Sequence, residues 1–154
     1  MAFELLIHSD SIDGSRVFED SSENGYPIEP YLHLTNITDH STDYAKWGAT
    51  SMDFKTWTYA SLALGSGTVN FGFLNLDFVI DFWIKNPNGY PNGQIFNLGN
   101  SLILTSNGTQ YAFTFRYGSS GTFITNFNCA GVWGDWNHVA ICRSGSTLYF
   151  YVNG

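Results

Sequence analysis

The sequence predicts an all-β fold, and three observations lead to that class. Hydrophobic and polar residues alternate with a period of two wherever a run is long enough to score, which is typical of strands that bury one face. Clusters of Gly, Asn, Ser and Pro separate these runs at short intervals. Hydrophobic residues reach 44% and aromatic residues 18%, while charged residues make up only 12%, a composition that suits a sandwich or a barrel. No long segment keeps the helical period of about 3.6 residues with caps, so we expect only short helical turns.

The clearest strand is predicted from Leu76 to Lys85, where four large hydrophobic side chains fall on one face. The opposite face carries charged residues together with Val79 and Trp83. The runs Tyr111–Tyr117 and Leu148–Val152 alternate in the same way and are rich in good strand formers. Further strands are predicted at Phe3–His8, Gln94–Leu98, Ser101–Thr105, Thr122–Phe127, His138–Arg143 and, as the weakest pattern, Tyr59–Leu64. Turns are predicted between them at residues 86–89, 91–93, 106–108, 118–121 and 144–146.

The length of 154 residues fits one domain, and we expect residues 1–154 to share a single core. Residues 10–47 are less regular and rich in Ser, Asp, Asn and Pro, so loops with one or two short strands are expected there. This stretch is too short for a linker between independent cores, and the chain shows no internal repeat.

The net charge of -7 argues against nucleic acid and anionic membranes as partners, because the six basic residues are scattered and form no stripe. No apolar run approaches the ~20 residues that span a bilayer. The N-terminus lacks a basic leader and a long apolar stretch, so we expect no secretory signal and synthesis in the cytoplasm. Cys129 and Cys142 are interpreted as buried hydrophobic residues, with a disulfide across a hairpin as the alternative.

Four stretches in order carry a resemblance to a known family. The first is Leu5–His8 followed by the Asp-Ser-Ser-Glu-Asn-Gly turn at Asp20–Gly25. The second is Lys46–Phe54, the third is Asp77–Ile84, and the fourth and most specific is Trp136–Gly154 with its Trp-Asn-His-Val-Ala start and Tyr-Val-Asn-Gly end. Together they are similar to the laminin-G-like and concanavalin A-like lectin/glucanase jelly-roll family, in particular to variants found in phage virion proteins and bacterial surface proteins.

The resemblance implies an antiparallel jelly-roll sandwich of two sheets. In that family further strands follow the Tyr-Val-Asn-Gly turn, whereas this sequence stops at Gly154. We therefore expect either a sandwich that lacks its last strands and pairs with material from elsewhere, or a longer product.

Catalytic patterns are absent, so no enzyme activity is expected and no catalytic residue is assigned. Retaining glycosidases need two carboxylates ~5 Å apart, but none of the four glutamates falls in the strand-rich half. Asp77 and Asp81 share a strand face but lie ~13 Å apart along it, and are interpreted as solvated strand residues. The histidines and cysteines show no zinc-ligand spacing, and no serine elbow or phosphate loop is present.

No cofactor or metal is assigned, although the resemblance leaves calcium open. Members of the family bind calcium through loop carboxylates, which makes Asp10, Asp13 and Asp20 the candidates here. An EF-hand is excluded, because aligning Gly14 with the loop glycine puts Asp20 where a bidentate Glu belongs. A polar turn is the alternative interpretation of this stretch.

Aromatic residues in or beside predicted loops are the candidate ligand-binding residues: Trp57, Tyr59, Tyr90 and Trp133. An exposed ring at such a position stacks on a sugar or docks against a protein. We therefore expect a non-catalytic structural or adhesion module of a phage virion that presents a protein- or glycan-binding surface. The expected partners are other subunits of an assembly, in a homo- or hetero-oligomer, and a host glycan. The alternative is a carbohydrate-binding module of a larger enzyme or adhesin.

Overall fold

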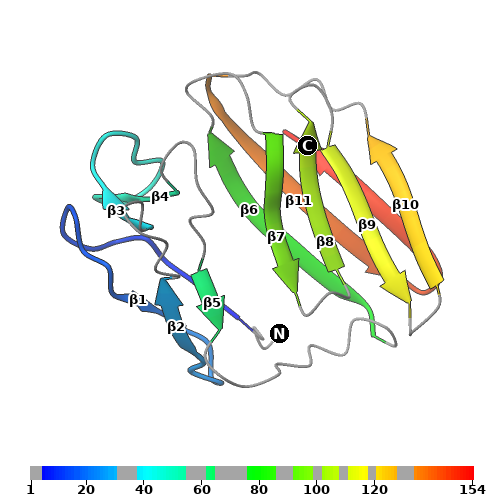
Figure 1. Cartoon of the computed structure of the whole chain (residues 1–154), viewed down its shortest axis with the longest axis horizontal. Coiled ribbons are helices and arrows are strands. Elements are labelled where there is room, and N and C mark those ends of the chain that lie inside the picture. The colour runs from blue at the N-terminus through cyan, green and yellow to red at the C-terminus, as the bar shows by residue number, and fades with distance from the viewer. Residues whose placement is uncertain are drawn as a thin grey trace. The chain divides into compact units, whose positions relative to one another are not determined.

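A computed structural model describes residues 5–30, 38–54, 62–64, 76–85, 92–98, 102–107, 111–117, 121–127 and 134–154 (Figure 1). Twelve strands and no helix lie within these ranges, and every strand pair is antiparallel, which confirms the all-β prediction. No described helix is therefore long and apolar enough to cross a bilayer. The chain divides into two compact units, residues 1–69 and 70–154, and each is described by itself. The prediction of a single domain stays a prediction.

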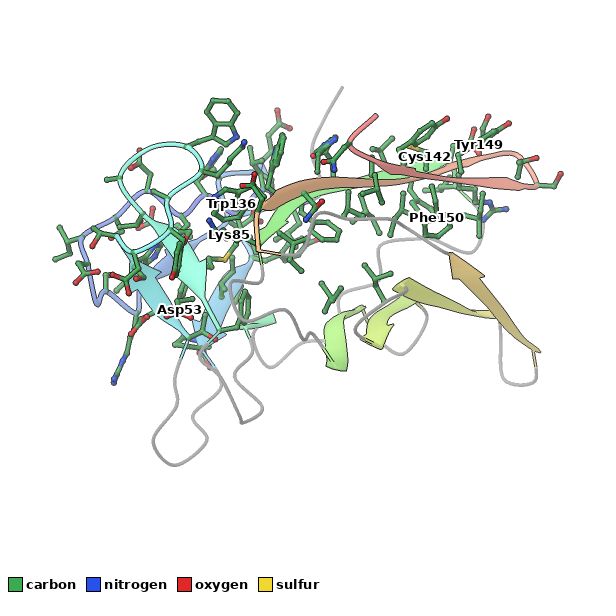
Figure 2. All side chains as sticks on the ribbon, turned by 90° about the horizontal axis from the view of Figure 1, so that it is seen from above. Asp53, Lys85, Trp136, Cys142, Tyr149 and Phe150 are labelled. Carbon is green, nitrogen blue, oxygen red and sulfur yellow. The ribbon has the colours of Figure 1, made fainter. Side chains whose placement is uncertain are left out.

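Two antiparallel sheets form the 70–154 unit. One has the strand order β12-β11-β6 and the other the order β10-β9-β8-β7. The strands of the first sheet are β6 (Phe78–Lys85), β11 (Trp136–Ser144) and β12 (Thr147–Val152). Those of the second are β7 (Asn92–Leu98), β8 (Leu102–Asn107), β9 (Tyr111–Tyr117) and β10 (Gly121–Phe127). Figure 2 shows the two sheets as separate layers, so the unit is a sandwich.

The core of this unit lies between the two sheets. Leu104 of β8 and Ile141 of β11 are fully buried, and Val139 of β11 is nearly so. Partly buried hydrophobic residues surround them, namely Phe78, Ile80, Phe82, Ile84, Ile95, Leu148, Phe150 and Val152. All of these from β6 and β12 belong to the hydrophobic set that the period-two alternation placed on one strand face, so that prediction is confirmed.

A tight hairpin joins β11 to β12, as the turn prediction for residues 144–146 required. Ser144 pairs with Thr147, which leaves two residues in the loop. Gly145 has φ +57°, a value that a residue with a Cβ rarely adopts and that the first position of a type II′ turn requires. The amide of Gly145 also donates to Oδ1 of Asp77 at 2.7 Å, which ties the hairpin to the start of β6.

The 1–69 unit contains only short strands. The strands β1 (Phe18–Glu19), β2 (Pro27–Pro30) and β5 (Leu62–Leu64) pair in the order β1-β2-β5, and β3 (Asp39–Ser41) pairs with β4 (Ser51–Asp53). The described part of residues 10–47 thus holds three short strands among loops, whereas the sequence predicted one or two.

A buried histidine connects the loops of this unit. His40 is 2% exposed, and its ring stacks on Phe18 with 4.3 Å between centroids. Its Nε2 donates to the carbonyl of Val17 at 2.9 Å, because a carbonyl can only accept. In the neutral ring its Nδ1 then accepts from the hydroxyl of Ser9 at 2.7 Å.

The backbone around His40 is bonded to the same loop. The amide of Gly14 donates to the carbonyl of His40 at 2.7 Å, and the amide of His40 donates to the carbonyl of Ser15 at 2.8 Å. Nearby, Thr50 Oγ1 donates to the carbonyl of Ser9 at 2.8 Å. Residues 9–17 are therefore held to His40 of β3 and to Thr50, which directly precedes β4, by backbone and side-chain hydrogen bonds together.

Three local predictions were wrong. Within Phe3–His8, the described residues from 5 onward contribute one isolated bridge, Ile7 to Asp20, in place of a strand. The turns predicted at residues 91–93 and 106–108 were also wrong, because Asn92 and Gly93 lie inside β7 and pair with Asn107 and Ser106 of β8. The ladder to β8 outweighs the turn preference of Asn-Gly, a common outcome because strand propensity depends strongly on context.

Candidate binding face of the three-stranded sheet

The four aromatic residues that the sequence nominated, Trp57, Tyr59, Tyr90 and Trp133, lie outside the residues that the structure describes. Their role as ligand-binding residues stays a prediction. The described part of the 70–154 unit instead presents aromatic residues on a strand face, where the sequence analysis assigned no site.

The outer face of the three-stranded sheet is the side turned away from the core. In Figure 2 Cys142 and Tyr149 point away from the four-stranded sheet, whereas Phe150 points toward it. The strand register aligns the outer residues in rows across β6, β11 and β12. These rows are Val79, Cys142 and Tyr149; Asp81, Ala140 and Tyr151; Trp83 and His138; and Lys85 and Trp136.

This outer face is unusually hydrophobic for a side that meets solvent. Val79 is 62% exposed, Tyr151 45%, Tyr149 43% and Trp83 38%. The solvent side of an antiparallel sheet is normally polar, so that strands alternate hydrophobic and polar residues. A contiguous exposed patch of this kind marks an interaction site more often than isolated hydrophobic residues do.

A polar pair stands among the rings of the outer face. Nε2 of His138 donates to Oδ1 of Asp81 at 3.0 Å, and the Asp81 side chain still exposes 57% of its surface. The Trp83 and His138 rings lie 5.0 Å apart at an interplanar angle of 39°. The face therefore places an indole, an imidazole and a carboxylate next to one another.

The backbone at His138 is fixed from the end of β12. Its amide donates to Oδ1 of Asn153 at 3.0 Å, and its carbonyl accepts from the amide of Asn153 at 3.0 Å. Asn153 adopts φ +60°, and its Nδ2 donates to Oδ1 of Asn137 at 3.1 Å. The Tyr-Val-Asn-Gly end of the motif thus positions the histidine of the Trp-Asn-His-Val-Ala start.

The area of the outer face indicates whether a small ligand or a protein partner fits it better. Three strands about 4.8 Å apart and about 26 Å along β6 between Asp77 and Lys85 give an area of roughly 10 by 26 Å between Cα positions. Side chains enlarge this area, but it stays well below the ~800 Å² that each partner contributes to a standard protein interface. The outer face fits a small ligand or a short stretch of polymer better than it fits a protein partner.

The outer face also carries a thiol. Cys142 is half-buried and free, so the disulfide that was left open with Cys129 is not formed in this structure. Its half-buried place on the outer face differs from the buried position that the sequence predicted.

The calcium candidates do not come together. Asp10 Oδ1 accepts from the amide of Ala49 at 3.1 Å, and Asp13 Oδ1 accepts from the amide of Thr42 at 3.0 Å. Among the described residues no group of three or more His, Cys, Asp or Glu side chains is arranged to hold a metal ion. These carboxylates connect loops to one another through backbone amides.

Asp20 organises the turn that opens the sequence motif. Its Oδ1 accepts from the amides of Leu6 and Ser22, both at 2.9 Å, and its Oδ2 accepts from the amide of Tyr26 at 2.9 Å and from the Ser22 hydroxyl at 2.8 Å. Partial burial raises the pKa of this carboxyl, but the hydrogen bonds outweigh burial and lower the pKa from 3.8 to about 2.

This hydrogen bonding predicts a pH-dependent contribution to stability. The folded pKa of about 2 lies below the unfolded value, so ionised Asp20 stabilises the fold above about pH 4, and the contribution disappears as the pH falls through 2. After allowance for solvent screening we expect Asp20→Asn to cost about 1 kcal/mol at neutral pH. Urea unfolding of both proteins at several pH values checks this. The difference in the free energy of unfolding should shrink toward pH 2, and a difference that stays constant with pH would contradict the prediction. Asp43→Asn, at an exposed position, serves as the control.

Asp77 and Asp81 lie apart along the strand, and each accepts a hydrogen bond from a different residue. Asp77 accepts a hydrogen bond from the amide of Gly145 at the hairpin, and Asp81 accepts a hydrogen bond from the His138 ring in the middle of the sheet. Both were interpreted as solvated residues, yet each has a defined hydrogen-bond donor. They form no pair that would share a proton across a glycosidic bond.

The outer face was not among the predicted sites, although the sequence carries a signal for it. The alternation assigned Trp83 to the face of β6 that also carries Asp77, Asp81 and Lys85. An indole on the polar face of an amphipathic strand is the feature that marks the site. Exposed rings were expected in loops, and aromatic residues within strands were expected in the core.

Comparison with known proteins gives one match. The family model for laminin G domains of the concanavalin A-like lectin/glucanases superfamily matches residues 39–154, well over half of the chain. No curated protein and no solved structure matches. The family agrees with the antiparallel sandwich and with the motifs at Asp77–Ile84 and Trp136–Gly154. The chain belongs to the concanavalin A-like lectin/glucanase superfamily.

Proposed function

We propose that this protein is a non-catalytic binding module that holds a carbohydrate on the outer face of its three-stranded sheet. The observation that carries the proposal is the exposed Trp83 ring beside the hydrogen-bonded Asp81 and His138 pair. The face of an aromatic ring stacks on the apolar side of a sugar ring, and a neighbouring carboxylate accepts hydrogen bonds from the hydroxyl groups of the sugar. The small area of the outer face supports a saccharide over a protein partner.

The Asp81 and His138 pair supports binding in place of catalysis. Acid and base work on a glycosidic bond needs a second carboxylate facing the first across the substrate. The next carboxylate along the outer face of β6 is Asp77. It lies about 13 Å from Asp81 and accepts a hydrogen bond from the amide of Gly145. Asp81 is therefore assigned a ligand-binding role as a hydrogen-bond acceptor.

We further propose that the module belongs to a larger assembly, a phage virion, where it contacts other subunits and a host glycan. The support is the likeness of the four motifs to variants found in virion proteins. Light scattering on a sizing column tests this setting. Self-association supports it, whereas a monomer would favour the alternative of a carbohydrate-binding module from a larger enzyme or adhesin.

Replacing Trp83 with alanine is expected to lower glycan affinity by about 10- to 100-fold, the usual loss when a central aromatic contact is removed. A glycan array identifies a ligand, and calorimetry then compares the variants. Trp47→Ala is the matched control, because Trp47 is 71% exposed but belongs to the other unit. Equal losses in the two variants, or no retained glycan at all, would overturn the proposal.

A further inference from the structure

We infer that the outer face takes a linear chain of at least three sugars in preference to a single sugar, with one sugar stacked on Trp83 and another on Tyr149 or Tyr151 of β12. This inference rests on the proposed function, and it names the class of saccharide that the same site takes. It follows from where the exposed rings lie on the sheet and from the side chains that lie between them.

Exposed rings occupy two separate positions on the outer face. Trp83 lies on β6 and is 38% exposed, whereas Tyr151 and Tyr149 lie on β12 and are 45% and 43% exposed. Figure 2 shows Tyr149 on the side away from the core, and Tyr151, two residues further along the strand, shares that face. The row beyond Trp83 holds Lys85 and Trp136, which are both half-buried. The second exposed position is therefore on the tyrosine side of Trp83.

The strand register fixes the distance between these two positions. Tyr151 lies one row from Trp83 and two strands across, because it shares a row with Asp81 and Ala140. With strands about 4.8 Å apart and rows about 6.6 Å apart, the Cα atom of Trp83 is about 12 Å from that of Tyr151 and about 16 Å from that of Tyr149. A pyranose ring is similar in size to the six-membered ring on which it stacks, so one sugar cannot cover both positions.

The side chains between the two positions leave a path for a chain of sugars. On the middle strand β11 the row of Tyr151 holds Ala140, whose single methyl group raises no barrier between the larger side chains of β6 and β12. Beside this path stands the hydrogen-bonded pair of Asp81 and His138, with the Asp81 side chain 57% exposed. Its carboxylate can accept hydrogen bonds from a sugar that stacks on neither ring. The order of ring, polar pair and ring thus matches a chain of at least three sugars.

A covalent link between the sugars makes the second stacking contact intramolecular. Once one sugar is stacked on Trp83, the sugars joined to it are held near the tyrosines at a high effective concentration. Removal of a central aromatic contact commonly costs about tenfold or more in affinity, and a second such contact adds a comparable gain. We therefore expect affinity to rise with chain length until the chain reaches both positions, and to level off beyond that length.

Calorimetry with saccharides of increasing length tests this expectation. The probes are cello-oligosaccharides and N-acetylated chito-oligosaccharides, each from the monomer to the hexamer. In at least one series we expect the tetramer to bind about 10- to 100-fold more tightly than the dimer, and the hexamer to bind within about threefold of the tetramer.

Variants show whether the tyrosines supply the second contact. Tyr151→Ala should cost the tetramer about ten times more affinity than it costs the dimer, whereas Trp83→Ala should weaken both ligands. Tyr151→Phe keeps the ring and should restore the advantage of the tetramer. Ala140→Ile suits a strand but fills the path between the rings, so it should remove most of that advantage. Tyr44→Ala is the matched control, because Tyr44 is 47% exposed but belongs to the other unit.

Each contrary result overturns a different statement. A dimer that binds as tightly as the tetramer would overturn the inference while the binding function stands. Equal losses of tetramer affinity in Tyr151→Ala and in Tyr44→Ala would show that the tyrosines of β12 hold no sugar, and would overturn the inference as well. A proline hexamer that binds as tightly as the tetramer would overturn the assignment to a saccharide. If neither series binds, the inference fails, and the glycan array decides separately whether the proposed function stands.

Discussion

Replacing Ile141 with alanine should lower the free energy of unfolding by about 3 kcal/mol, within the range of 2 to 5 kcal/mol for such changes. Ile141 is fully buried in the middle strand of the three-stranded sheet, in one cluster with Leu104 and Val139. The substitution removes three carbons from a position that both sheets enclose, and the remaining cavity loses packing contacts. Urea unfolding followed by tryptophan fluorescence measures the loss.

The matched control is Val79→Ala on the opposite side of the same sheet. Val79 lies on β6 beside Cys142 of β11, and it is 62% exposed. Because most of the valine side chain already meets water, we expect a loss below about 1 kcal/mol. Comparable losses for the two variants would contradict the assignment of the core and outer faces.

The strand faces of the 70–154 unit were predictable from the sequence because a strand repeats every two residues. Phe78, Ile80, Phe82 and Ile84 pack against the core as their spacing required. The same parity placed Trp83 outside, and the strand pairing then brings His138 beside it. To predict that His138 is the neighbour of Trp83 one needs the register of β6 with β11. That register joins positions 55 residues apart, and no local pattern encodes it.

The 1–69 unit was less predictable for a related reason. Its described strands are two to four residues long, too short for a period to show. The order in residues 9–17 comes from hydrogen bonds to residues 23 to 41 positions away. Sequence patterns indicated loops in this region correctly, but they carried no information about which polar side chains are buried. His40 is the clearest example, because a histidine between Asp and Ser in a polar stretch gives no sign that it is 2% exposed.

His40→Leu should therefore destabilise the 1–69 unit by about 2 to 3 kcal/mol. Leucine keeps much of the volume against Phe18 but leaves the Ser9 hydroxyl and the Val17 carbonyl without the ring that now bonds both. Each buried polar group that loses its partner costs about 1 to 3 kcal/mol, and the lower end applies at Val17 because that residue is largely exposed.

Hydrogen exchange of the native protein measures this effect where it arises. The amides of Gly14 and of position 40 are both bonded across the loop, and they should exchange about 30- to 100-fold faster in the leucine variant. His40→Gln retains an amide donor for the Val17 carbonyl, so it should recover part of the protection. Unchanged exchange at both amides in the leucine variant would show that backbone pairing of β3 holds the loop without the imidazole. Protection lost equally in both variants would show that ring stacking on Phe18 matters more than the two side-chain hydrogen bonds.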